Sequence, residues 1–248
     1  MSYAKRAAIH YISSFGILLL TIAIIAGTMN GTALPDLIAG GTIQDNIAPV
    51  IVIDAGHGGE DCGAVGTNGI LEKDLNLYIA RLVATLLRAA GYQVIETRTN
   101  DALLYDPITV EKGQKKVTDL KNRLLISEAQ ERAILVSIHM NSFPASPEQS
   151  GTQIWYGGEN EYSFEVARML QKYIVDEFGL GRKRSIMKSK GDLYLLDRST
   201  HPAVILECGF LSNVEECAKL SDEKYRNELS FAIFCAMIDI INAYGGTT

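Results

Sequence analysis

Two short apolar runs, residues 50–54 and 134–139, most constrain the fold of this 248-residue chain. Neither run alternates apolar with polar residues, which is typical of strands buried on both faces of a parallel sheet. Each leads to a histidine: His57 lies in a glycine-rich loop after the first run, and His139 ends the second. Because open α/β sheets carry their chemistry where buried strands run out into loops, the two histidines mark one candidate site.

Helical and extended patterns alternate along the rest of the chain. Strands that alternate with helices generally pair in parallel, because each helix carries the chain back to the same edge of the sheet. The chain is therefore predicted to be an α/β protein with a mostly parallel sheet and helices on both faces. The predicted helices cover residues 72–90, 119–132, 162–178 and most of 213–244. Further strands are predicted at residues 92–97, 152–156, 193–196 and 203–207.

The N-terminus has the pattern of an export sequence. Lys5 and Arg6 precede a largely apolar run of about 18 residues, which is near the shortest length that spans a bilayer. Small residues at 31 and 33 form a possible signal-peptidase cleavage site after Ala33. A cleaved signal peptide and a retained membrane anchor are both consistent with this pattern. In either case the domain is expected to work outside the cytoplasmic membrane. The predicted parts are a signal peptide or membrane anchor (1–33), a linker (34–48) and one domain (49–248).

Composition argues against nucleic acid as a partner. The formal charge is −6, and the aromatic residues, 8% of the chain, are not interleaved with Lys or Arg. The four cysteines match no compact disulfide framework. Cys217 and Cys235 lie on apolar helix faces and are expected in the core. Cys62 and Cys208 are close in sequence to His57 and Glu207, and a role for them as alternative metal ligands is the less favoured interpretation.

His57, Glu72 and His139 have the layout of a zinc site in a hydrolase. Such sites commonly take three ligands from His and carboxylate side chains and leave a fourth position for water. Glu72 opens a predicted helix whose N-terminus favours an ionised carboxylate and should fold back over the first strand. Taken singly, each residue also fits an ordinary role, as a hydrogen-bonding loop histidine or a solvated acid. His10, in the export segment, and His201, before a proline, are expected to be uninvolved.

Glu207 closes the apolar run AVILE. A carboxylate at the end of a buried strand is costly unless it is paired or functional. Partial burial near a cation suits a general base, because desolvation raises the pKa of the carboxyl while the cation lowers it. The alternative is a carboxylate paired with an arginine such as Arg123 or Arg198, and the residues alone leave the two interpretations level.

Several separated stretches occur in the order seen in a known family: VIVIDAGHGGEDCGAVG, LEKDLNL, VSIHMNS, GTQIWY and LYLLDRSTHPAVILECGFLSNVEE. They resemble the zinc-dependent N-acetylmuramoyl-L-alanine amidases, which cut peptidoglycan in bacterial cell walls. The resemblance implies one zinc ion per chain, bound by His57, Glu72 and His139, with Glu207 as the catalytic acid/base. It implies cleavage of the amide between the lactyl group of N-acetylmuramic acid and L-alanine of the stem peptide. It also implies that residues 49–248 form the catalytic domain, built on a single twisted sheet of about six strands.

Within this family, a short chain with an export segment and no wall-binding repeats resembles the germination-specific branch. That branch takes part in making muramic δ-lactam in the spore cortex, which implies a location in the forespore intermembrane or cortex space. Only residues 157–161 separate a predicted strand from the next helix, so the plugging helical insertion of some relatives is not expected. Regulation is then expected from zinc supply, timing of expression or an activating protein partner.

Further features bear on substrate binding. Asn141 lies just past His139 and is a candidate for hydrogen bonding to substrate or to a ligand, with a plain turn role as the alternative. The polar loop 99–117 and the five basic residues of 182–190 are candidate contacts for glycan or peptide carboxylates. For the basic segment, a solvated loop is the favoured interpretation. Two rival functions remain: another zinc peptidase of the cell wall, and a non-catalytic muropeptide-binding module.

Overall fold

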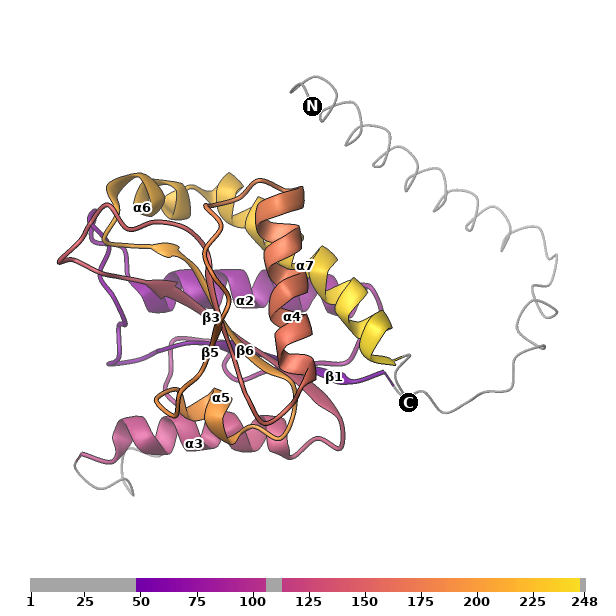
Figure 1. Ribbon diagram of the computed structural model, residues 1–248. Helices are drawn as coiled ribbons and strands as arrows, with labels where there is room; N and C mark the ends of the chain where they lie inside the picture. The colour runs from indigo at the N-terminus through magenta and orange to yellow at the C-terminus, as the bar shows by residue number, and fades with distance from the viewer. Residues whose placement is uncertain (1–47, 106–112, 246–248) are drawn as a thin grey trace, which may run out of the picture. The chain divides into compact units, whose positions relative to one another are not determined.

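The structure, a computed structural model, describes residues 48–105 and 113–245 (Figure 1). The predicted signal or anchor lies outside the described residues, as does all but the last residue of the predicted linker. The strands are β1 (Val50–Ala55), β2 (Val94–Glu96), β3 (Ala133–Asn141), β4 (Gln153–Tyr156), β5 (Met187–Lys188) and β6 (Ala203–Phe210). The helices are α2 (Glu72–Ala89), α3 (Lys115–Glu128), α4 (Tyr162–Gln171) with its π-helical continuation η1 (Lys172–Glu177), α5 (Tyr194–Arg198), α6 (Val214–Ser221) and α7 (Glu223–Gly245).

The strands form one six-stranded sheet in the order β2-β1-β3-β6-β4-β5. β1 pairs in parallel with β2 and β3, and β3 pairs in parallel with β6. β4 runs antiparallel to β6, and β5 runs parallel to β4. Figure 1 shows α2, α4 and α7 over one face of the sheet and α3 with α5 over the other. The prediction of a single, mostly parallel sheet of about six strands with helices on both faces is confirmed.

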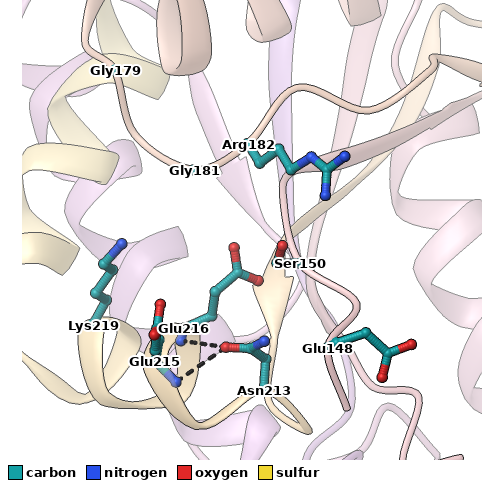
Figure 2. Close-up of a pocket in the computed structure, with 9 residues that line it drawn as sticks. All are labelled: Glu148, Ser150, Gly179, Gly181, Arg182, Asn213, Glu215, Glu216 and Lys219. Atoms are coloured by element: carbon teal, nitrogen blue, oxygen red, sulfur yellow. Dashed lines mark hydrogen bonds between the residues drawn. The ribbon is translucent and has the colours of Figure 1, made fainter. Parts of the chain in front are cut away.

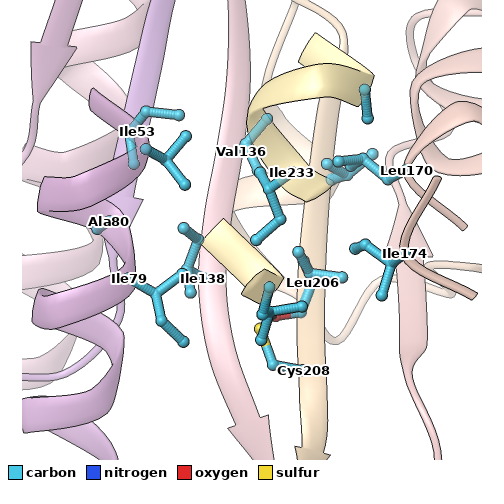
Figure 3. Close-up of a cluster of buried hydrophobic side chains, with 14 of the residues drawn as sticks. Ile53, Ile79, Ala80, Val136, Ile138, Leu170, Ile174, Leu206, Cys208 and Ile233 are labelled. Carbon is cyan, nitrogen blue, oxygen red and sulfur yellow. Dashed lines mark hydrogen bonds between the residues drawn. The ribbon is translucent and has the colours of Figure 1, made fainter. Parts of the chain in front are cut away.

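Residues along each central strand alternate between two buried clusters. Ile53, Ile138 and Leu206 pack on one face with side chains from α2, α4 and α7, and Figure 3 shows this larger cluster. The intervening residues, such as Val52 and Leu135, pack on the other face against α3 and α5. Because both faces are covered, these strands are apolar over most of their length, and each buried Ile or Leu contributes about 1.5–3 kcal/mol.

Helix α7 is the one described helix that is long and apolar enough to span a membrane, with a mean hydropathy of 1.3. Its residues Leu229, Ile233, Met237 and Ile240 are buried in the larger cluster. The helix packs against α2 and α4. We therefore interpret α7 as a core helix, and membrane attachment stays a prediction for residues 1–33.

One local expectation on the second half of the chain is wrong, and another holds only in part. The strand predicted at residues 193–196 is the short helix α5, whose Asp197 carboxylate accepts a hydrogen bond from the Leu193 backbone N–H at 2.7 Å. A four-residue apolar run does not distinguish a strand from a buried turn of helix. The solvated-loop interpretation of residues 182–190 also fails in part, because β5 lies inside this segment and pairs with β4. Of the five basic residues, Lys188 lies on β5, and Lys183 forms an isolated bridge with Thr152.

Candidate metal centre

The three predicted ligand residues meet at the carboxyl ends of β1 and β3. His57 follows β1, His139 lies near the end of β3, and Glu72 is the first residue of α2. Their ligand atoms all lie within 4.8 Å of one another, and theirs is the one such cluster among the described residues. Glu72 Oε1 lies 3.2 Å from His57 Nε2 and 3.0 Å from His139 Nδ1. Two imidazole nitrogens and a carboxylate that converge in this way suit the donor set of a zinc ion.

The glycine-rich loop passes so close to these side chains that two of its positions have no room for a Cβ atom. A Cβ at Gly56 would lie 2.2 Å from the His139 ring, and one at Gly63 would lie 2.5 Å from Glu72 Oε2. His57 itself has a φ of 62°, in the left-handed region that residues other than glycine adopt at a cost. The loop is therefore shaped around the histidine and glutamate side chains.

Glu72 is held as a carboxylate. Burial raises its pKa, but hydrogen bonds and charge from His139 and His57 bring the pKa well below its usual range. Its Oε2 accepts the Ala64 backbone N–H at 2.8 Å, and its Oε1 accepts the Met140 backbone N–H at 3.0 Å. An ionised, oriented carboxylate is the state in which this side chain can bind a cation.

Asp61 is a site residue that the sequence reasoning missed. Its Oδ2 lies 2.9 Å from His57 Nδ1, on the far side of the ring from Glu72. Burial lowers the pKa of His57, but Glu72 and Asp61 together raise it above its usual value. A carboxylate on one ring nitrogen fixes the orientation and the tautomer of a histidine that binds metal through the other. The sequence signal was the acid four residues after His57, inside the same loop.

Two buried arginines hold the loop from behind. Arg123, on α3, donates to the carbonyl oxygens of Ala55 and His57, both at 2.7 Å. Arg98 donates to the Ala55 carbonyl at 2.8 Å and to that of Gly56 at 3.0 Å. These bonds satisfy carbonyl groups that a turn between strand and helix would otherwise leave unpaired.

Arg123 is neutralised by acids other than Glu207. Its guanidinium pairs with Asp54 at 2.7 Å and with Asp119 at 2.7 Å, and all three side chains are buried. Burial raises the pKa of Asp54, but Arg123 and two hydroxyl groups bring it below its ordinary value of 3.8. The pair with Asp54 therefore contributes stability at neutral pH and loses it as the pH falls through the folded-state pKa of that carboxyl.

We expect Arg123→Met to lower the free energy of unfolding by about 3–5 kcal/mol, because it leaves buried carboxylates without a counter-charge. The matched control is Arg168→Met, which breaks an exposed pair with Glu165 and should cost under about 1 kcal/mol. Urea unfolding at pH 7 measures both. The gap between wild type and Arg123→Met should shrink as the pH falls toward 3, where protonated Asp54 needs no partner. Equal stability of the two variants at pH 7 would contradict this role.

Glu207 lies beside the cluster on β6. Its Cα is the register partner of His139 across the parallel β3–β6 pair. Its Oε2 is buried without a hydrogen-bond partner, and the carboxylate forms no ion pair with any described side chain. Burial raises the pKa of Glu207 to about 7, with the negative charge of Glu72 adding to the shift and the two histidines opposing it. The predicted alternative of an arginine partner is wrong within the described residues, since Arg198 stacks on Tyr194 and Arg123 pairs elsewhere.

A cavity of about 250 Å³ opens next to the cluster on the α3 and α5 face of the sheet. His57, His139, Tyr194 and Ile205 are among its lining residues. The cavity therefore reaches both histidines of the cluster. A second pocket, of about 440 Å³, lies at the start of α6, where Asn213 caps the helix (Figure 2). Its lining includes Arg182 of the basic segment but none of the predicted metal ligands or the predicted acid/base.

Asn141 has a local role in the structure. Its side-chain oxygen accepts the Ser142 backbone N–H at 2.8 Å, and its backbone carbonyl accepts the Leu211 N–H at 2.8 Å. These bonds fit the turn interpretation, and substrate binding by Asn141 stays a prediction. The polar loop 99–117 is described only in part, because residues 106–112 lie outside the described ranges.

The remaining cysteine and histidine candidates lie outside the cluster. All four cysteines are free, and neither Cys62 nor Cys208 joins the three ligand residues. Cys217 is buried as expected, whereas Cys235 is only half-buried. His201 contacts the Gln130 carbonyl through Nε2 at 3.1 Å, and His10 lies outside the described residues.

Comparison with known proteins identifies the family. The family model described as N-acetylmuramoyl-L-alanine amidase, Amidase_3, matches residues 51–239. The germination-specific N-acetylmuramoyl-L-alanine amidase of Bacillus subtilis is 36% identical over 187 residues, which cover 75% of this chain and 76% of that protein. The matched range contains all four candidate residues, His57, Glu72, His139 and Glu207.

Two solved amidase structures have folds similar to this chain. The CwlD amidase from Clostridioides difficile, in complex with the GerS lipoprotein, superposes with a TM-score of 0.72 at 34% identity over 79% of this chain and 99% of that one. The catalytic domain of CwlV, an N-acetylmuramoyl-L-alanine amidase from Paenibacillus polymyxa, gives 0.67 at 33% identity over 78% and 98%. Because the family model matches residues 51–239 and the Bacillus subtilis relative is 36% identical over three quarters of both chains, this chain belongs to the Amidase_3 family of N-acetylmuramoyl-L-alanine amidases.

Proposed function

We propose that the chain is a zinc hydrolase that cuts the amide between the lactyl group of N-acetylmuramic acid and L-alanine in peptidoglycan. His57, Glu72 and His139 are the proposed zinc ligands, and Glu207 is the proposed acid/base. The observation that carries this proposal is that the three ligand atoms meet within 4.8 Å. The buried, unpartnered oxygen of Glu207, the register neighbour of His139, supports the acid/base role beside them. Two half-buried imidazoles around a buried carboxylate, beside an unpaired acid, are typical of a site that binds a cation and a polar reactant.

Each site residue has a separate role in the proposed hydrolysis. Zinc, when bound, would acidify a water molecule and polarise the lactyl carbonyl. Glu207 removes a proton from the attacking water, and a pKa of about 7 suits proton exchange near neutral pH. Glu207 then delivers this proton to the L-alanine nitrogen, so that the stem peptide leaves as a neutral amine. Asp61, at 2.9 Å from Nδ1, keeps the His57 ring in a fixed orientation during these steps.

We further propose that the reaction takes place outside the cytoplasmic membrane and serves the spore cortex. Cutting this amide frees the lactyl carboxyl, which is the group that must close to form a muramic δ-lactam. The similarity to a germination-specific amidase supports the cortex as the substrate. The complex of the Clostridioides difficile CwlD amidase with a lipoprotein supports a protein partner for this chain as well. Export or anchoring through residues 1–33 is part of the proposal.

The test is product analysis with the zinc-loaded full chain and purified muropeptides. Mass spectrometry should find stem peptides with a free L-alanine amine and muramic acid with a free lactyl carboxyl, and a chelator should abolish both. A new amine elsewhere in the stem peptide would instead identify a zinc peptidase. Binding of muropeptide by zinc-loaded protein without any cleavage would identify a binding module.

A further inference from the structure

Arg184, in the basic segment beside β4, is a half-buried guanidinium without a carboxylate partner. It donates to Gln153 Oε1 at 3.0 Å, to Gln149 Oε1 at 3.1 Å and to the Ser150 carbonyl at 3.0 Å. All of these acceptors are neutral, and no described acid pairs with Arg184. A partly desolvated positive charge with neutral partners only is costly, and an anionic ligand offsets that cost.

The guanidinium is fixed before any ligand arrives. It lies over the Phe210 ring, with 5.0 Å between its central carbon and the ring centroid. The backbone carbonyl of Arg184 accepts a hydrogen bond from Gln171 at 2.6 Å, and the next carbonyl, of Ser185, accepts one from Gln153. One terminal nitrogen, Nη2, has no hydrogen-bond partner among the described residues. Preorganised donors of this kind lose little conformational entropy on binding.

Arg184 lies close to the proposed acid/base. Gln153, its hydrogen-bond partner, is the register partner of Glu207 across the antiparallel β4–β6 pair. Directly opposed residues in such a pair lie on one face, with Cβ atoms about 5 Å apart. The Gln153 side chain thus lies between Glu207 and Arg184, and Arg184 is at the edge of the reaction site.

An open groove of about 640 Å³ continues from this point along β4 and β5. Trp155, Arg182 and Arg184 are among its lining residues, and no acid is. Lys183 also lines it but is neutralised by Asp176 at 2.8 Å. Trp155 is the register partner of Ile205, which lines the cavity at the histidines. The groove and the cavity therefore adjoin on the same face of the sheet.

We propose that Arg184 binds a carboxylate of the stem peptide on the L-alanine side of the cut amide, an inference that rests on the proposed function. In peptidoglycan the residue after L-alanine is a γ-linked glutamate, which keeps a free α-carboxylate. Two residues of extended peptide reach about 7 Å, and Glu207 and Arg184 are both direct neighbours of Gln153, the first by strand register and the second by a hydrogen bond. The Trp155 side chain supplies apolar contact for the peptide in the same groove.

The experiment compares two muropeptides that differ only in this α-carboxylate, free in one and amidated in the other. The zinc-loaded full chain should cut the free acid with a kcat/KM about tenfold higher, the effect of one charge-assisted hydrogen bond. R184Q should erase this preference. R184K, which keeps the charge but lacks the planar set of guanidinium N–H donors, should retain part of it. The matched control K190Q removes an exposed charge of the same segment, outside the groove, and should keep the full preference.

Binding of the released peptide gives a second, independent readout. By calorimetry, the wild-type chain should bind L-alanyl-γ-glutamate more tightly than its α-amide, and R184Q should bind both equally. Cleavage of both muropeptides at equal rates by the wild type would overturn the carboxylate site and leave the amidase intact. Failure to cut either muropeptide, with the acid still preferred in calorimetry, would overturn the amidase and leave the carboxylate site. Equal binding of both peptides by the wild type would overturn the site.

Discussion

Replacing Glu207 with glutamine should lower kcat on muropeptides by about 10³-fold, within the range that a general acid–base group contributes, and leave the zinc content unchanged. Glutamine has the size of the native side chain but cannot accept a proton from water at neutral pH. Glu207 is not among the three side chains whose ligand atoms meet within 4.8 Å, so its replacement should not release metal. Steady-state kinetics and metal analysis of one preparation measure both quantities.

The matched control for this variant is Glu148→Gln, which changes an exposed glutamate on the loop between β3 and β4. It should have the kcat and zinc content of the wild type. A kcat near that of wild type in Glu207→Gln would remove Glu207 from the mechanism. Loss of zinc from Glu207→Gln would instead make Glu207 a ligand, and the unpartnered Oε2 would need a different explanation.

Replacing His139 with alanine should lower the affinity for zinc by about 10²-fold or more, and with it the activity. Changes to groups that only support a ligand cost 10–100-fold, and loss of a ligand should cost at least as much. The variant also leaves Glu72 with His57 as its one remaining imidazole partner, because the 3.0 Å contact with His139 is lost. Zinc content after dialysis, followed by kcat on the same sample, measures the result.

His201→Ala is the matched control for the loss of an imidazole. His201 contacts a backbone carbonyl at the end of α3 and lies outside the metal cluster, so its variant should bind zinc normally. Normal zinc content in His139→Ala would break the ligand assignment. Together the two predictions separate metal binding from proton transfer, since Glu207→Gln should lose turnover alone and His139→Ala should lose both.

The predictable part of the fold rests on local patterns. The runs at residues 50–54 and 134–139 became β1 and β3, and the helical spacing after Glu72 became α2. Once two buried strands pair in parallel, their carboxyl ends must lie at one edge of the sheet, and so His57 and His139 meet there. Glu72 joins them because α2 begins where the glycine-rich loop returns to the sheet. Their convergence followed from the sequence, whereas their role as zinc ligands remains our proposal.

Short segments were predicted less well. The four apolar residues at 193–196 fit a strand and a helical turn equally, and the contacts of Asp197 with the preceding backbone decided for the helix. β5 is only two residues long and has no pattern of its own, so that only its pairing with β4 reveals it. The antiparallel direction of β4 likewise has no local signature.

The sequence by itself determined the α/β class, the parallel centre of the sheet and the residues that meet at its edge. Only the tertiary structure decided the partners of the charged residues. Arg123 and Asp54 are 69 residues apart, and Arg184 reaches the neighbourhood of Glu207 through Gln153, 31 residues away. The spacing of apolar residues that forms a helix or a strand can be read from neighbouring positions in the sequence. The partner of a buried charge instead depends on which distant groups the folded chain places within hydrogen-bond reach. For this reason only the folded structure shows that Glu207 Oε2 has no hydrogen-bond partner. This absence of a partner favours the proposed role as a base over that of a structural acid.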